Sequence, residues 1–230
     1  MKIFRNIFIL ILVFVAQSAF ASGYPDYGFS TGNGVRLRES PSTDSKILGR
    51  VDESSMLVLL GEVKAGGKTW YKVEHPTKRG TAWIFGEYVD NYASFDTDTP
   101  AYKTLVQLFR DCGVTAEKAR VLLGKPKRTS KRKFFFDPAN QDFHEEVLEY
   151  PTFKLQYIEG RLRHVESSGE ALSFGDVSVG DTTAQVLDVL GEPDGKGDEG
   201  WSYEVSPRDV LLFEFRGGRV AKMTFDNYID

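Results

Sequence analysis

Residues 113–126 read GVTAEKARVLLGKP, and residues 180–193 read GDTTAQVLDVLGEP, so one pattern returns 67 residues later without a gap. Each copy has a threonine near a helix N-cap (Thr115 or Thr182), a short apolar helix, and then the glycine and proline that end a helix. Self-similarity over this distance indicates an internal structural repeat. The pattern predicts two short helices in matching places.

The copies also correspond at their far ends. Residues 155–162 read LQYIEGRL and residues 213–220 read FEFRGGRV, each typical of a strand, a glycine turn and the start of another strand. The offset here is 58, so the middle of the first copy is nine residues longer, and we expect the extra residues in a loop. Each copy is predicted to be a helix followed by an antiparallel meander, with both sets of helices laid on one continuous sheet.

Together these patterns resemble the repeat of β-lactamase inhibitor protein, which small outer-membrane-assembly lipoproteins carry as a single copy. The resemblance covers residues 100–230. It implies an α+β module, residues 101–230, of two repeats at about 101–168 and 172–230, and it implies a module that binds a protein. Apolar residues from Tyr102 to Phe109 predict a further helix that breaks at Cys112-Gly113, after a polar linker at residues 93–100.

A β-rich segment precedes the repeats, between Gly34 and Val89. Apolar and polar residues alternate there, and Gly66-Gly67 and Arg79-Gly80 mark turns. The spacing predicts five short strands and no helix. Strands this short and this closely spaced predict a compact barrel or sandwich.

The blocks VRLRESPS (35–42), KILG (46–49), WYKV (70–73) and AWI (82–84), followed by Tyr88-Val89, resemble the bacterial SH3 domain over residues 29–92. Ala82 departs from the family, which usually has glycine before this tryptophan. The resemblance implies a small all-β barrel that binds cell-wall peptides or other envelope ligands. The whole chain is therefore predicted to be multidomain, an SH3-like barrel followed by the α+β module.

Alternation along the strands predicts which barrel residues face a ligand. If Tyr71 and Val73 point inward, Trp70 and Lys72 point outward, and Trp83 points outward beside inward Ile84. Exposed aromatic rings are suited to ligand binding, although both tryptophans could instead cap the small core. The predicted ligand-binding residues are Arg36, Arg38, Trp70, Lys72, Trp83 and Tyr88.

The segments after the two repeat helices have opposite charge. The second carries acidic residues from Glu192 to Glu199, whereas the first is rich in lysine and arginine up to Phe134. Such a basic run is either a patch for an anionic polymer or acidic protein, or the solvated arm of a hairpin. The predicted patch consists of Lys127, Arg128, Lys131, Arg132 and Lys133.

Residues 1–21 have a basic start, an apolar run too short to span a membrane, and small residues before a cut after Ala21. They predict a cleaved secretory signal and a periplasmic or secreted protein. Ser22 follows the cut, where a lipoprotein would need cysteine, so we expect no lipid anchor. The chain has 230 residues, 41% of them hydrophobic, and a formal charge of −4, which is globular composition without a bulk charge for nucleic acid.

Three functions are weighed. The first is an exported non-catalytic adaptor, and the second is a protein inhibitor or envelope-assembly factor that acts through the repeats. The third is a thiol peptidase with Cys112, the only cysteine, and His164 as base, but a lone pair without a third group is common by chance. No zinc, calcium or phosphate-loop motif is complete, so we expect neither metal nor cofactor.

Overall fold

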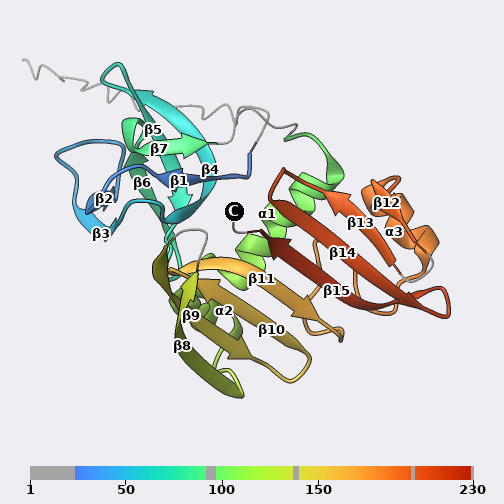
Figure 1. Ribbon diagram of the computed structural model, residues 1–230. Coiled ribbons are helices and arrows are strands. Elements are labelled where there is room, and N and C mark those ends of the chain that lie inside the picture. Colours follow the sequence, from blue (N-terminus) through green and yellow to red (C-terminus); the bar gives the residue numbers. More distant parts are fainter. Residues whose placement is uncertain (1–23, 92–96, 137–139, 198–199, 229–230) are drawn as a thin grey trace, which may run out of the picture.

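The computed structural model describes residues 24–91, 97–136, 140–197 and 200–228. Their strands form two antiparallel sheets, and the described helices are few (Figure 1). The predicted signal peptide lies outside the described residues, as do residues 92–96 at the predicted linker. The chain resumes before Thr99, whose side chain caps the helix that begins at Pro100, so that helix takes the last residue of the expected linker.

The first sheet has seven strands in the order β3-β2-β6-β5-β4-β1-β7. The bounds are β1 Asp26–Ser30, β2 Val35–Arg38, β3 Ile47–Val51, β4 Met56–Ala65, β5 Lys68–Glu74, β6 Thr81–Phe85, the 3-10 helix η1 Gly86–Tyr88, and β7 Val89–Asn91. Five of these strands, β2 to β6, lie between Gly34 and Val89, as expected, and β1 and β7 flank them. The 3-10 helix η1 is a short helical turn where none was expected. The structure also starts this sheet at Asp26, before the expected boundary at residue 29, because β1 pairs with both β4 and β7.

The inside of the first sheet is an apolar core. Its buried members are Val35, Leu37, Val51, Leu57, Leu59, Val73, Ala82 and Ile84, with Tyr71 packed against them. Alternation therefore works as expected on β5 and β6: Tyr71, Val73 and Ile84 point inward. Their strand neighbours Trp70, Lys72 and Trp83 face the other side.

The second sheet has eight strands in the order β12-β13-β14-β15-β11-β10-β9-β8. The bounds are α1 Pro100–Cys112, α2 Ala116–Leu123, β8 Arg128–Phe136, β9 Gln141–Glu149, β10 Phe153–Ile158, β11 Arg161–Ser167, α3 Thr183–Leu190, β12 Gly195–Lys196, β13 Gly200–Glu204, β14 Asp209–Arg216 and β15 Arg219–Asn227. Two successive four-stranded meanders thus meet through their last strands, β11 and β15.

The two halves of this sheet share local details. Thr115 caps α2 and Thr182 caps α3, each accepting a backbone N–H three residues on. Both helices end at a glycine with positive φ, 80° at Gly124 and 77° at Gly191. A tyrosine hydroxyl donates to each of these glycine carbonyls, from Tyr150 at 3.1 Å and from Tyr203 at 3.0 Å.

The sequence suggested that the nine extra residues of the first half lie in a loop. In the structure some of them lengthen strands instead. Strands β8 and β9 have nine residues each, whereas β12 has two and β13 has five. Added pairs of residues continue a hairpin ladder, since each new pair makes cross-strand contacts. The insertion therefore lengthens a hairpin.

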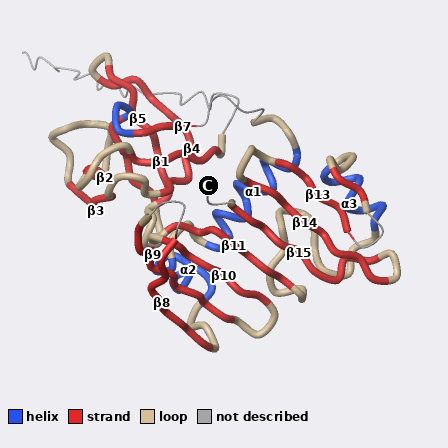
Figure 2. Tube along the Cα trace, viewed as in Figure 1, coloured by secondary structure: helices blue, strands red, loops and turns tan. Residues whose placement is uncertain are grey.

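The two sheets are joined through a continuous apolar core. Tyr27 of β1 and Met56 and Val58 of β4 belong to the same buried cluster as α1 and the helix-facing side of the second sheet. The Tyr27 ring is stacked on Tyr102 at 5.6 Å and meets the edge of Phe109 at 5.2 Å. In the view of Figure 2, α1 and α2 lie behind the strands of the second sheet. The linked modules therefore pack as one body.

Polar contacts add to this junction at the β5–β6 turn. Lys118 of α2, only 3% exposed, donates to the backbone oxygens of His75 at 3.1 Å and Lys78 at 2.9 Å. The Thr115 hydroxyl donates to the Pro76 carbonyl at 2.6 Å. Glu74 forms an ion pair with Arg110 of α1 at 2.8 Å. The β5–β6 turn and the end of β5 are thus bound by polar contacts to both α1 and α2.

Candidate functional site

A groove lies on the outer side of the first sheet, between β2, the ends of β5 and β6, and η1. Its volume is about 370 Å³. We call it the barrel groove, and its lining residues are Asn33, Gly34, Val35, Arg36, Arg38, Thr43, Trp70, Phe85 and Tyr88. The structure thus brings together four of the six predicted ligand-binding residues.

The other two predicted residues lie beside the groove. Lys72 and Trp83 are cross-strand partners on the outer side, next to the pair formed by Trp70 and Phe85. Neither lines the groove. Sequence reasoning missed Phe85, although it stands two residues after Trp83 on the same strand and the same alternation would have placed it there.

Trp70 is the floor of the groove. It belongs to neither apolar core, yet it is only 3% exposed, so the expectation of an exposed ring was wrong. The cover comes from Phe85, whose ring centre is 5.3 Å away, and Phe85 in turn meets the edge of Tyr88 at 6.0 Å. Within the described chain the Trp70 indole N–H has no hydrogen-bond acceptor. Trp70 lines the groove, and its indole N–H is not among the described side-chain atoms that are buried without a partner.

The charge of the groove is positive. Arg36 is exposed, and its guanidinium makes no hydrogen bond or ion pair in the part of the chain that the structure describes. Arg38 is 7% exposed and donates to the Ser45 carbonyl at 2.8 Å. The Lys68 ammonium lies 4.8 Å from the centre of the Phe85 ring. No carboxylate is among the lining residues, so the groove offers donors to a ligand rich in acceptors.

The predicted anionic-partner patch is largely neutralised within the sheet. Lys131 pairs with Glu146 at 3.3 Å, Lys133 pairs with Asp142 at 2.6 Å, and Arg132 makes two hydrogen bonds to Glu145. The register of β8 against β9 explains this, since it sets the basic strand beside an acidic one. Of the five predicted residues, Lys127 and Arg128 keep side chains without such a partner among the described residues.

The predicted thiol is in an unfavourable place for catalysis. Cys112 is 0% exposed, and burial raises the pKa of its thiol well above the ordinary value, which opposes formation of the nucleophilic thiolate. The ring of His164 instead pairs with Asp226 at 2.5 Å on the second sheet. Among the described residues no group of histidine, cysteine and acidic side chains could hold a metal ion.

Comparison with known proteins identifies the first module. Residues 33–90 match the family described as bacterial SH3 domain. The match confirms the first resemblance drawn from the sequence. The family comparison does not confirm the second resemblance, that of residues 100–230 to the repeat of β-lactamase inhibitor protein.

The comparison with curated proteins finds no match. One solved structure with a partial match is an extracellular protein containing a SCP domain from Bacillus anthracis str. Ames. Sequence identity is 9% and the TM-score is 0.32, over 52% of this chain and 45% of that chain. The match thus spans less than half of that protein. No described helix is long and apolar enough to cross a membrane.

Proposed function

We propose that this protein is an exported, non-catalytic binding protein of the bacterial cell envelope, and that its SH3 domain holds a cell-wall peptide in the barrel groove. The supporting observation is the convergence of Arg36, Arg38, Trp70 and Tyr88 on one groove of a bacterial SH3 domain. The signal-like residues 1–21 support export to the periplasm or beyond.

The open donors of the groove favour a peptide with free carboxylates. The indole N–H of Trp70 and the guanidinium of Arg36 suit a carbonyl and a carboxylate, and hydrogen bonds to a charged partner are the stronger kind. The rings of Phe85 and Tyr88 supply flat contact area that costs little conformational entropy. An acceptor-rich, acidic peptide fits this combination better than an apolar ligand does.

For the second module we propose two copies of one helix-plus-meander repeat, which together bind a protein. The support is the matched element order, the matched helix ends and the matched strand irregularities between Gln156 and Tyr157 and between Glu214 and Phe215. No ligand follows from this likeness. The groove of the first module therefore carries the functional proposal.

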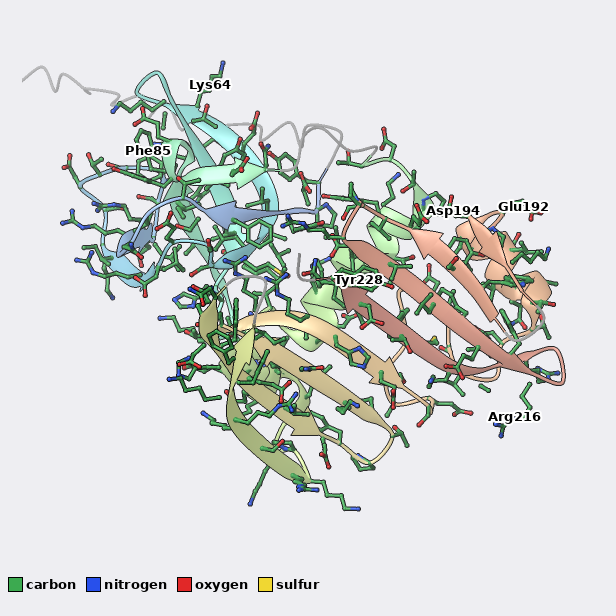
Figure 3. The ribbon with its side chains drawn as sticks, in the orientation of Figure 1. Lys64, Phe85, Glu192, Asp194, Arg216 and Tyr228 are labelled. Atoms are coloured by element: carbon green, nitrogen blue, oxygen red, sulfur yellow. The ribbon has the colours of Figure 1, made fainter. Side chains whose placement is uncertain are left out.

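The test is co-sedimentation of the mature chain with purified peptidoglycan. Arg36→Gln removes an exposed cation that the described fold does not use, and Trp70→Phe removes the indole N–H but keeps a ring. We expect each variant to raise the Kd at least fivefold. Lys64→Gln is the matched control, because Lys64 is also exposed on the first module and does not line the groove (Figure 3).

Two results would overturn the assignment. One is wild-type binding by both Arg36→Gln and Trp70→Phe, which would place the contact elsewhere. The other is no pelleting of the unchanged chain. Circular dichroism of each variant distinguishes a lost contact from a lost fold.

A further inference from the structure

A second positive surface lies on the second module, where α2 ends and β8 begins. Its hollow has a volume of about 450 Å³. We call it the basic hollow, and its lining residues are Arg120, Lys125, Pro126, Lys127, Arg128 and Thr129. Four of the six are cations and none is acidic, so the hollow has a single sign of charge.

Three of these cations are not used by the described fold. Lys125, Lys127 and Arg128 are exposed, and their side chains make no hydrogen bond or ion pair with any other described residue. Arg120 differs, because it pairs with Glu146 at 2.5 Å. The cations that follow on β8 also differ, since residues 131–133 are each paired with an acid of β9.

The other half of the sheet supplies an internal control. Cations after a helix are often explained by the negative end of the helix dipole. Helix α3 ends in the same way as α2, at a glycine whose carbonyl accepts from a tyrosine, yet the next charged residues are Glu192 and Asp194. Figure 3 shows these two at the α3 end of the molecule, far from α2 and β8. The fold therefore does not require cations after such a helix.

We infer that the basic hollow binds a phosphate-bearing polyanion. Arginine and lysine together suit phosphate, arginine through its planar fork and lysine as a point charge. A folded acidic protein fits less well, because stable protein interfaces have an aromatic or apolar centre. The large exposed apolar residues of the described chain are Ile47, Tyr88, Phe135 and Tyr228, and none of them lines the hollow. This inference stands independently of the function proposed for the barrel groove.

The experiment measures binding of the full mature chain to inorganic polyphosphate over a range of salt concentrations. We expect the triple variant Lys125→Gln, Lys127→Gln, Arg128→Gln to bind at least tenfold more weakly. The slope of log K against log salt should fall in magnitude by about 2, because fewer counterions are released. Vesicles of phosphatidylglycerol form a second arm, which separates a lipid headgroup from a free polymer as the source of phosphate.

The matched control is a second triple variant, Lys131→Gln, Arg132→Gln, Lys133→Gln. It removes the same charge from nearby residues of β8, but from residues paired with acids of β9, and should change the affinity less than threefold. Equal losses in both triple variants would show a bulk charge effect and overturn the inference. The inference would also be overturned if the unchanged chain did not bind polyphosphate at low salt. It would be overturned as well if the first triple variant had a lowered Tm but bound polyphosphate as tightly as the unchanged chain. Arg36→Gln should leave polyphosphate binding intact, which separates this test from that of the groove.

Discussion

The substitution Lys118→Met tests whether the two modules unfold together. Lys118 belongs to α2, but its ammonium donates to two carbonyls in the β5–β6 turn of the SH3 domain and lies 3.7 Å from the Glu74 carboxylate. Methionine fills a similar volume without a donor. The change therefore removes the hydrogen bonds and the ion pair of the Lys118 ammonium but keeps the packing of its side chain.

The expected cost follows from the exposure of each partner. The His75 carbonyl lies in buried surroundings and would lose a charged donor, whereas the Lys78 carbonyl is only partly buried and can turn to water. A lost donor at a buried acceptor costs about 1–3 kcal/mol, and Glu74 keeps its pair with Arg110. Because removing a buried ammonium also recovers its desolvation cost, we expect the free energy of unfolding to fall by about 1–2 kcal/mol.

Urea unfolding monitored by two probes measures this. In a Trp201→Phe background the fluorescence of Trp70 and Trp83 reports the SH3 domain, while circular dichroism reports the helices of the second module. Both probes should give one coincident transition, shifted equally by Lys118→Met. A loss below about 0.5 kcal/mol would refute the energetic reasoning. Two separated transitions in the unchanged chain would refute the shared core as a cooperative unit.

Three further outcomes are expected. Burial raises the pKa of Asp26, so this residue contributes most to stability when it is protonated. That contribution is lost as the pH rises through the raised pKa. Asp26→Asn should therefore flatten the pH dependence of the urea midpoint above about pH 4. Tyr150→Phe and Tyr203→Phe should each cost about 0.5–1.5 kcal/mol in urea unfolding, and a difference between them above about 1 kcal/mol would contradict equivalent helix ends. A thiol reagent should modify Cys112 only after unfolding, because the side chain is fully buried, and rapid modification of the native protein would contradict that burial.

Local signals in the sequence predicted much of the architecture. Two helices were predicted from their ends. Each begins after a threonine N-cap and ends at a glycine, Gly124 or Gly191, and such residues help to satisfy the free backbone groups at helix ends. Period-two alternation placed Arg36 and Arg38 with Trp70 on the outer side of the barrel, since it depends only on the geometry of a strand.

Features that depend on contacts between distant segments were not predictable. The burial of Trp70 arises from Phe85 on another strand, so alternation indicated its side of the sheet but not its exposure. The sequence left open whether the basic run was a patch for an anionic partner or the solvated arm of a hairpin, because the register of β8 against β9 was unknown. That register supplies Glu145 and Glu146 as partners. Nothing in the sequence indicated that Tyr27 would pack on a helix of the other module.

The shared core also determines how ligand binding reaches the rest of the chain. Tyr27, Met56 and Val58 are buried against the second module, so cutting between the modules would expose apolar surface on both. A ligand that binds only the folded state stabilises everything that unfolds with it. Under the proposed function, and with the modules unfolding together, a peptide in the barrel groove would therefore protect the second module as well. Under the same proposal, we expect proteases to degrade the wall-bound protein more slowly than the free protein.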